Sequence, residues 1–258
     1  MAAIFFDIDG TLWDRENRIP ESTKEAVLRL REKGHLSFLC SGRTKALIRD
    51  EKLLGLGFDG ILGGCGTQIV YRGERLFCHE IEKETLIKTV RILKECRMPI
   101  LMEGETYMFM DPEVAANPYG RYIQETLGEF VKPLTGNEDQ WRASKLTVMI
   151  PGADVERAEH LLKDDYQMLC HGKWVMELVP KGFSKAKGIQ KVCEALGISR
   201  DDTVAFGDSI NDRDMLEYAA CGIAMGNGTE AAKEAADYIT DDIHQDGIYH
   251  ALEHFGLI

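Results

Sequence analysis

The stretch "FFDIDGTLW", Phe5–Trp13, places two carboxylates one residue apart at the end of an apolar run. The run 2–6 is short and continuously apolar, which is typical of a strand that is buried on both faces of a sheet. Asp7 and Asp9 follow it at once, and residues two apart in extended backbone point to the same side. Because two ionised carboxylates at close range repel each other, we expect either a cation between them or a proton on one of them.

Apolar strands and amphipathic helices alternate around this stretch. We expect helices at 22–33 and 44–54, and strands at 36–40, 58–64 and 67–71. The same rhythm returns near the C-terminus, with helices at 184–196, 213–220 and 230–236 and strands at 203–208 and 222–226. This β-α-β alternation predicts an α/β fold, with a Rossmann-like parallel sheet and helices on both of its faces.

A different rhythm interrupts the α/β pattern, because a helix followed by two strands occurs twice in succession. The expected helices are 83–96 and 154–164, the expected strands are 99–104, 106–111 and 145–152, and a hairpin is expected at 166–180. Residues 112–127 are a mixture of helix and loop, interrupted at Asn117-Pro118. We interpret 82–181 as an inserted α+β cap domain with an antiparallel sheet, and 1–81 with 182–258 as one discontinuous core.

Length and composition are those of a soluble, globular protein with one large domain or two modest ones. The chain has 258 residues, of which 44% are hydrophobic and 29% are charged. No apolar run approaches the ~20 residues of a membrane span, so we expect no membrane partner. No secretory signal is visible, and the seven cysteines form no C-x-x-C pair, which favours reduced thiols in a cytoplasmic protein.

The charge balance argues against a nucleic-acid partner. The net charge is −12, from 31 basic and 43 acidic residues, and neither the expected core nor the expected cap has the basic excess that a nucleic-acid surface needs. An anionic substrate remains compatible with this balance, because a bound cation can dominate the electrostatics of a local site.

Polar side chains gather at the expected carboxyl ends of the strands, where ligands bind in parallel sheets. The group consists of Asp7 and Asp9, Ser41 and Gly42, Lys185 at the start of a helix, and Asp208. Ligands that are all oxygen, in a site that meets a phosphate, suit Mg²⁺.

The remaining features of this group suit a phosphoryl ligand. Gly10 permits a sharp turn, and Thr11 begins a loop whose amides can meet an anion. Ser41 and Gly42 precede an expected helix, whose N-terminus favours anions, and Lys185 adds a mobile positive charge. In such a site one carboxylate can attack phosphorus while a second one transfers protons.

Taken in order, these motifs resemble a known family. "DIDGT" after a strand, "SGR" after the next, a lysine after the insertion and "GDSINDRDML" are similar to the four motifs of the haloacid dehalogenase (HAD) superfamily. The single α+β cap between the second and third motifs resembles the Cof-type phosphatase branch, which acts on sugar phosphates and related metabolites. The late stretch "GIAMGNGTEAAKEAADYIT", followed by "DGI", is typical of the same branch, and the resemblance covers essentially the whole chain.

The resemblance implies a role for each matching residue. Asp7 would be the nucleophile and a Mg²⁺ ligand, and Asp9 the general acid and base, with its backbone carbonyl on the metal. Ser41 and Lys185 would bind the phosphoryl group, and Asp208 would be the second carboxylate ligand. The other residues expected at the site are Thr11 and Gly42 beside the phosphate, with Asn211, Asp212 and Arg43 in support.

The sequence leaves the roles of several residues open. Cys65 stands where the family often has asparagine, which puts the polar contacts beside the site in doubt. Arg43 could contact substrate or form an ion pair with cap or core. In the cap, Glu103, Tyr107, Tyr119 and Trp174 could line a substrate pocket or serve the hairpins and the core.

Three functions remain in competition. The implied function is a Mg²⁺-dependent phosphatase for a small phosphorylated metabolite that works through an aspartyl-phosphate. The alternatives are a phosphotransferase or phosphomutase with the same intermediate, and a non-catalytic module that binds phosphorylated metabolites. The sequence leaves the substrate and the oligomeric state open.

Overall fold

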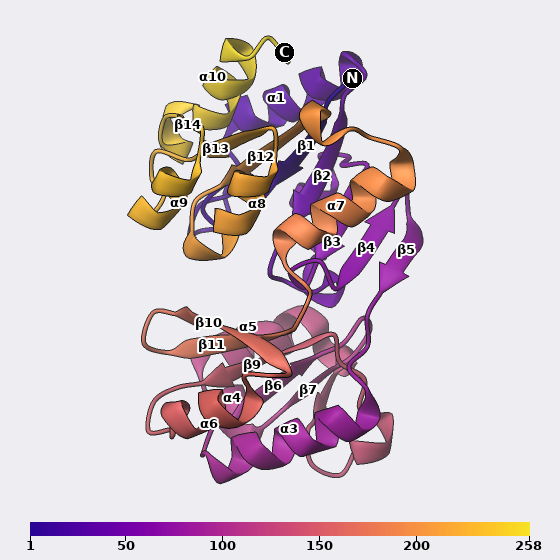
Figure 1. Cartoon of the computed structure of the whole chain (residues 1–258), viewed down its shortest axis with the longest axis vertical. Helices are drawn as coiled ribbons and strands as arrows, with labels where there is room; N and C mark the ends of the chain where they lie inside the picture. The colour runs from indigo at the N-terminus through magenta and orange to yellow at the C-terminus, as the bar shows by residue number, and fades with distance from the viewer. The chain divides into compact units, whose positions relative to one another are not determined.

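The computed structural model describes residues 1–258, which form two compact units (Figure 1). The first unit consists of Met1–Gly42, Arg49–Phe77 and Ser184–Ile258. The second unit combines Cys78–Phe183 with the short segment Arg43–Ile48, which the sequence had assigned to the core. Every helix is too short or too polar to cross a lipid bilayer.

An eight-stranded sheet forms the centre of the first unit, in the order β14-β13-β12-β1-β2-β3-β4-β5. From β14 to β3 all neighbours are parallel, whereas β3 and β4 are antiparallel. The strands are β1 (Ala3–Phe6), β2 (Leu36–Cys40), β3 (Gly60–Gly63), β4 (Gln68–Tyr71), β5 (Glu74–Cys78), β12 (Thr203–Gly207), β13 (Cys221–Ala224) and β14 (Tyr238–Ile239). The parallel α/β core expected from the sequence is therefore confirmed.

Helices cover this sheet, and their apolar sides build its core. The helices α7, α8 and α9 contribute Ile189, Val192, Met215, Leu216 and Ala232 to a buried cluster that contains Phe5 and Phe38 of the strands. The helix α1 packs with α10, the last helix of the chain. The helices of this unit are α1 (Glu21–Glu32), α2 (Glu51–Leu54), α7 (Lys185–Leu196), α8 (Arg213–Tyr218), α9 (Glu230–Ala235) and α10 (Gly247–His254).

A six-stranded sheet forms the second unit, in the order β10-β11-β9-β6-β7-β8. Four of its five neighbouring pairs are antiparallel, but β7 and β8 are parallel, so the fully antiparallel sheet expected for the cap is wrong at this edge. The sequence pattern did not predict the short strand β8. The strands are β6 (Ile100–Glu103), β7 (Met108–Met110), β8 (Val131–Pro133), β9 (Lys145–Met149), β10 (Tyr166–His171) and β11 (Val175–Pro180).

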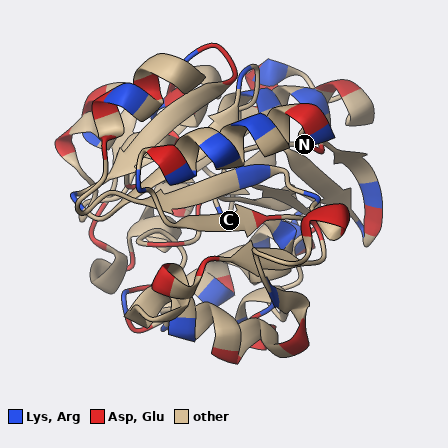
Figure 2. Ribbon diagram, turned by 90° about the horizontal axis from the view of Figure 1, so that it is seen from below, with Lys and Arg blue, Asp and Glu red and all other residues tan.

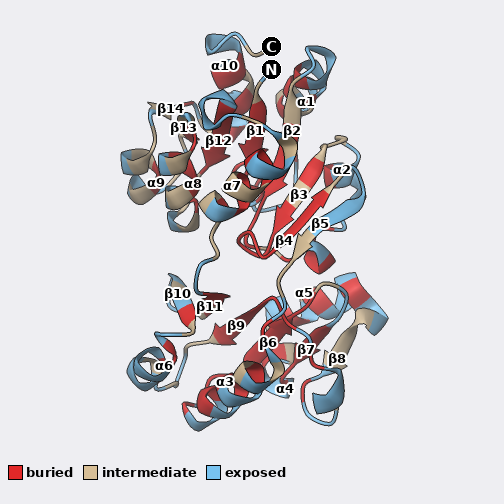
Figure 3. Ribbon diagram, turned by 45° about the vertical axis from the view of Figure 1, so that its right-hand side comes forward, coloured by how far each residue is buried: buried red, intermediate tan, exposed pale blue.

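The two faces of this second sheet have different partners. On one face, α3 (Lys83–Glu95) and α6 (Val155–Leu162) bury Leu86, Leu93 and Leu162 against the strands. On the other face, α4 (Pro112–Ala115) and α5 (Pro118–Leu127) pack with Ala46 and Leu47. Both sheets consist mainly of buried residues, while the outer sides of the helices are exposed (Figure 3).

The helix expected at 44–54 does not form as one element. A 3-10 turn occupies Lys45–Leu47, and α2 begins only at Glu51, after Asp50. The Asp50 side chain accepts hydrogen bonds from the Lys52 and Leu53 amides, which starts a new helix at that point. An α-helix therefore does not begin directly after Ser41 and Gly42, so the anion binding expected there would have to rely on side chains and loop amides.

Charged residues are distributed over both units. Figure 2 shows acidic and basic residues interspersed along the helices, in agreement with the negative net charge of the chain.

Candidate active site

The carboxyl ends of β1, β2 and β12 meet at one edge of the first sheet. The strand β1 lies between the other two, with Phe6 in register with Leu39 of β2 and Phe206 of β12. The Asp7 amide extends this ladder by donating to the Phe206 carbonyl at 2.9 Å. Since all three strands are parallel, their next residues, Asp7, Ser41 and Asp208, emerge at the same edge.

A cluster of carboxylates occupies this edge. Oxygens of Asp7, Asp208 and Asp212 lie within 4.8 Å of one another. The ammonium group of Lys185 lies 2.5 Å from Asp7 Oδ1 and also contacts Asp212 Oδ1. Asp7, Asp212 and Lys185 are all buried, whereas Asp208 is half-buried. If all are ionised, three carboxylates and one ammonium leave two uncompensated negative charges.

Burial and mutual repulsion perturb these groups strongly. Desolvation, followed by the charge of Asp212, raises the pKa of Asp7 well above its usual value, although Lys185 acts in the opposite direction. Desolvation and Asp212 also raise the pKa of Asp208 to about 7. The pKa of Lys185 is itself raised, because its two carboxylate partners outweigh the cost of burial. The negative charge of the carboxylates in this cluster is therefore larger than the positive charge that Lys185 supplies.

Asp212 is anchored on its other oxygen. Its Oδ2 accepts hydrogen bonds from the Asp208 amide at 3.0 Å and the Ser209 amide at 2.9 Å. Asn211 lies in the same turn, where its Oδ1 accepts from the Ser209 hydroxyl at 2.6 Å. Asp212 thereby fixes both the backbone of Asp208 and the ammonium group of Lys185.

The loop after Asp9 contacts the carboxylate of Asp208. The Thr11 hydroxyl donates to Asp208 Oδ1 at 3.0 Å. Gly10 has a φ of +86° and packs directly against the Asp208 carboxylate, so a side chain at this position would clash with it. Asn227 donates to the Gly10 carbonyl at 2.7 Å and holds the same loop.

Asp9 is exposed and has an aromatic partner. The indole Nε1 of Trp13, a side chain that is only 3% exposed, donates to Asp9 Oδ1 at 3.0 Å. Since an indole N–H can only donate, Oδ1 acts as the acceptor in this hydrogen bond, which orients the Asp9 carboxyl group.

Ser41 and Gly42 are buried at the end of β2, and Ser41 is joined to the turn that follows β3. The Ser41 carbonyl accepts from the Cys65 amide at 3.0 Å. Gly64, Cys65 and Gly66 all have positive φ angles, of 59°, 55° and 80°. Asparagine tolerates this left-handed conformation better than most residues, which gives a backbone reason for the asparagine that the family often has at Cys65.

Arg43 is the one expected site residue that groups with the second unit. Its Nη1 lies 3.4 Å from the Tyr122 hydroxyl of α5. Lys187, the other lysine near the third motif, is exposed and pairs with Gln190, so Lys185 alone joins the carboxylates.

Several residues that hold this site were not foreseen from the sequence. They include Trp13, Asn227 and Asp214, whose Oδ2 accepts from the Ala186 amide at 3.0 Å in the first turn of α7. The only signals were a tryptophan directly after "DGTL", an asparagine between two glycines and a third acid in the "GDSINDRD" motif. None of these reveals its partner, because each hydrogen bond joins segments whose approach depends on the fold.

The carboxylate cluster meets the requirements of Mg²⁺. Its donors are oxygens only, its carboxylates are close enough to share one cation, and their raised pKa values express a charge deficit that a divalent cation would relieve. Asp7 and Asp208 are the two carboxylates best suited to hold it. Both oxygens of Asp212 are already engaged, Oδ1 by Lys185 and Oδ2 by two amides, whereas Lys185 contacts only Oδ1 of Asp7.

Comparison with known proteins identifies the family of the chain. Residues 4–252 match the family model of haloacid dehalogenase-like hydrolases. The chain belongs to this family. It is 31% identical over 257 residues to the Bacillus subtilis (strain 168) protein YkrA, with 99% of this chain and 98% of YkrA covered. The resemblance to HAD superfamily phosphatases of the Cof type is thereby confirmed.

Two further relatives have more specific names. The chain is 28% identical over 275 residues to the 5-amino-6-(5-phospho-D-ribitylamino)uracil phosphatase YitU of Bacillus subtilis (strain 168), with 98% and 97% of the two chains covered. Among solved structures it is similar to the HAD subclass IIB sugar phosphatase BT4131, with a TM-score of 0.84, 29% identity and full coverage of both chains. An α/β core with an inserted cap is therefore the architecture of this HAD-like hydrolase as well.

Proposed function

We propose that this HAD-like hydrolase is a Mg²⁺-dependent phosphatase that hydrolyses small phosphate monoesters through a phosphorylated Asp7. The observation that carries the proposal is the buried contact of Asp7 with Lys185, beside Asp208 and Asp212. A site for binding alone would not need a buried carboxylate that repels the anionic ligand. A site for phosphoryl transfer needs one as its nucleophile.

In the first step a carboxylate oxygen of Asp7 attacks phosphorus, and the bond from phosphorus to the leaving oxygen breaks. Asp9 donates its proton to that oxygen, so that a neutral alcohol leaves. Lys185 remains beside Asp7 and compensates charge on the transferring group, together with the Ser41 hydroxyl and the amides of Gly42 and Thr11. Asp7, Asp208 and the Asp9 carbonyl would hold Mg²⁺, which would supply further positive charge beside the phosphoryl group.

In the second step Asp9, now ionised, takes a proton from a water molecule. The resulting hydroxide attacks phosphorus, the bond to Asp7 breaks, and inorganic phosphate leaves. Asp7 is regenerated as a carboxylate and Asp9 as an acid, so both residues return to their starting states. Asn211 and Asp212 support this cycle by fixing the turn that carries Asp208.

In this scheme the two units have different roles. The first unit carries every proposed catalytic side chain, while the second unit, as a cap, would contact the leaving group and select the substrate. Arg43 belongs to the cap by its contacts, and its proposed role is to support that selection. Sugar phosphates and related metabolites are the expected substrates, in line with the names of BT4131 and YitU.

A phosphotransferase or phosphomutase would use the same phosphorylated Asp7. Such an enzyme must pass the phosphoryl group to a second hydroxyl before water reaches it. Incubation with glucose 6-phosphate separates the two functions, because a phosphatase releases inorganic phosphate and glucose, while a mutase returns an isomeric sugar phosphate.

The decisive experiment is mass spectrometry of rapidly quenched protein with Mg²⁺ and p-nitrophenyl phosphate. In Asp9→Asn, whose amide can no longer activate water, we expect one added phosphoryl group on the peptide that contains Asp7. In Asp7→Asn this adduct should be absent, and hydrolysis should fall by roughly 10⁴-fold or more, the scale on which loss of a covalent catalyst acts. An Asp7→Asn protein with wild-type turnover would refute the proposal.

A further inference from the structure

A pocket of about 500 Å³ lies at the end of α3 and is formed entirely by residues of the second unit. Its walls come from the last turn of α3, the loop before β6, the end of β7, the start of α4 and the turn after β8. The polar residues that line it are Lys94, Arg97, Asp111, Glu113 and Thr135. None of these residues belongs to the proposed catalytic site.

Arg97 combines a left-handed backbone with a guanidinium group that has no partner. It follows Cys96, the C-cap of α3, and its φ of +57° lies in the region that favours glycine. Its exposed side chain makes neither a hydrogen bond nor an ion pair in the structure. Arg72 also has a positive φ, of 48°, but it pairs with Asp59 at 3.7 Å. The positive charge of Arg97 is therefore free to bind a ligand.

Lys94 and Asp111 are both incompletely paired. The Lys94 ammonium lies 3.9 Å from Asp111 Oδ1 and 3.5 Å from the Thr135 hydroxyl, and both distances are long for charge-assisted hydrogen bonds. Asp111 is only 7% exposed, and the Ile100 amide donates to its Oδ2 at 3.0 Å, which leaves Oδ1 without a hydrogen bond. Burial raises the pKa of Asp111, although the Ile100 amide and Lys94 act in the opposite direction. A cationic group beside Oδ1 would relieve this desolvation.

The charges that line the pocket balance, because two basic residues face a ligand together with two acidic ones. A simple anion would meet both carboxylates, and a simple cation would meet both basic groups. A zwitterion satisfies groups of both signs at once, which gives the pocket its selectivity. Met98, Pro99 and Pro112 supply the apolar part of the wall, where an apolar side chain would be removed from water.

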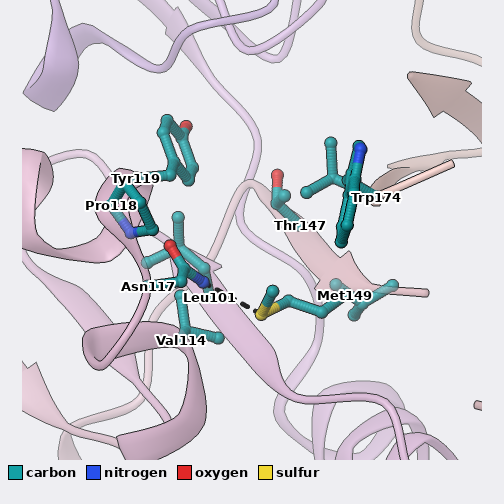
Figure 4. Close-up of a pocket in the computed structure, with 10 residues that line it drawn as sticks. Leu101, Val114, Asn117, Pro118, Tyr119, Thr147, Met149 and Trp174 are labelled. Atoms are coloured by element: carbon teal, nitrogen blue, oxygen red, sulfur yellow. Dashed lines mark hydrogen bonds between the residues drawn. The ribbon is translucent and has the colours of Figure 1, made fainter. Parts of the chain in front are cut away.

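A second cavity in the same unit, of about 310 Å³, has a different character (Figure 4). No charged residue lines it, and Tyr119 and Trp174 stand on opposite sides of it. Of the other two cap residues that the sequence singled out, Tyr107 packs on Phe130 and Glu103 is buried. A zwitterion in this apolar cavity would lose the hydration of both its charges without replacement, so Trp174 offers a control position.

We propose that the pocket at the end of α3 binds a free α-amino acid with an apolar side chain. Arg97 and Lys94 bind its carboxylate, and Asp111 and Glu113 bind its ammonium group. The apolar wall contacts the amino-acid side chain. This binding site is a further function of the chain and does not depend on the proposed phosphatase activity.

Isothermal titration calorimetry of the whole chain with L-leucine tests the proposal. We expect a Kd of about 1 mM or lower. The compound 4-methylpentanoate lacks the amino group of leucine, and 3-methylbutylamine lacks its carboxylate. Each should bind at least about tenfold more weakly, because each forfeits charge-assisted hydrogen bonds. Binding of either compound as tight as that of L-leucine, or no binding of L-leucine, L-isoleucine and L-methionine, would overturn the inference.

Two substitutions identify the groups that hold each end of the ligand. Arg97→Gly should weaken L-leucine binding at least about tenfold without lowering the midpoint of urea unfolding, since glycine adopts this φ without strain. Asp111→Asn keeps an oxygen for the Ile100 amide and removes the charge, so it should weaken binding of L-leucine but not of 4-methylpentanoate. Arg72→Gly and Trp174→Ala are the controls and should leave the affinity for L-leucine unchanged.

The catalytic variant Asp7→Asn keeps this inference separate from the proposed function, because it should bind L-leucine as wild type does. Binding of L-leucine without hydrolysis of any phosphate monoester would refute the phosphatase and support the amino-acid site. An affinity that falls in Trp174→Ala but not in Arg97→Gly would place the ligand in the apolar cavity and overturn the inference.

Discussion

Gly66 and Gly188 pack backbone against backbone, and a Cβ atom on either would lie 3.0 Å from the Cα atom of the other. Gly66 belongs to the left-handed turn after β3, and Gly188 lies in the first turn of α7, one turn after Lys185. This contact seats α7 against the turn that also holds Ser41, and so fixes the place from which Lys185 reaches Asp7.

Gly66→Ala should therefore damage both stability and activity. Its φ of +80° disfavours any side chain, and the new methyl group would clash with the Ser184 carbonyl at the start of α7. We expect a loss of roughly 2–4 kcal/mol in the free energy of unfolding and at least a tenfold fall in kcat. Gly73→Ala is the control, because Gly73 has a φ of +83° with open space around it. If both variants lose equal stability in urea unfolding and neither loses activity, the contact does not position α7.

Trp13→Phe tests the hydrogen bond to Asp9. Without the indole donor, the Asp9 carboxyl group loses this hydrogen bond, and the proposed acid is less well oriented towards the leaving oxygen. We expect kcat to fall by about tenfold for an alkyl phosphate but by less than threefold for p-nitrophenyl phosphate, whose leaving group needs little protonation.

The matched control for this change is Trp141→Phe. Trp141 is also buried, and its Nε1 donates to the Leu134 carbonyl at 3.0 Å in the second unit. Its loss should lower stability while the ratio between the two substrates stays constant. Equal losses on both substrates in Trp13→Phe would mean that Trp13 acts only through packing.

The parts of the site that follow strand ends could be predicted from the sequence. Asp7, Ser41 and Asp208 each come directly after an apolar run, and parallel strands bring such positions to one edge whatever the details of the loops. Lys185 was recognisable because it starts a helix directly after the insertion, whereas its burial between Asp7 and Asp212 depends on the packing of α7.

What the sequence could not reveal depends on long-range contacts. The run 44–54 has an amphipathic pattern, yet Ala46 and Leu47 pack with α4 and α5 of the second unit, and Asp50 starts a separate helix. The left-handed turn at Cys65 lacks the asparagine that would have signalled it. The parallel pairing of β8 with β7 joins two short strands across α4 and α5, a relationship that no local pattern encodes.

Mg²⁺ should stabilise the protein through Asp208. A ligand that binds only the native state raises the free energy of unfolding by an amount that grows with its concentration. We expect millimolar Mg²⁺ to raise the melting temperature of wild type by several degrees and that of Asp208→Asn hardly at all. Asp201→Asn is the control, since Asp201 is exposed just before the amino end of the same strand, β12. Activity in excess EDTA, or a Mg²⁺ shift that persists in Asp208→Asn, would contradict this assignment.

The last prediction concerns a buried ion pair in the second unit. Lys145 is 1% exposed and contacts both Glu103 and Glu177, and His171 Nε2 lies 3.1 Å from Glu177 Oε2. Burial alone would raise the pKa of Glu177, but the charge of Lys145, together with His171, lowers it to about 2. The same burial raises the pKa of Glu103 despite Lys145, so Glu177 is the carboxylate that this lysine mainly stabilises.

Because the pKa of Glu177 is lowered in the native state, the free energy of unfolding should fall as the pH is lowered. The pKa of Glu177 is lower in the native state than its usual value of 4.5, so ionised Glu177 stabilises the fold. This contribution is fully present above pH 4.5 and is lost as the pH falls towards 2. A shift of this size corresponds to on the order of 3 kcal/mol.

Glu177→Gln should therefore unfold at lower urea concentration than wild type at pH 7, and the difference between the two should shrink steadily between pH 4.5 and pH 3. Glu159→Gln, an exposed position on α6, should match wild type throughout. Fluorescence-detected urea unfolding at pH 7, 5, 4 and 3 measures these differences. A stability gap between Glu177→Gln and wild type that stays constant down to pH 3 would show that Glu177 contributes by its shape and hydrogen bonds, and that its charge is unimportant for the fold.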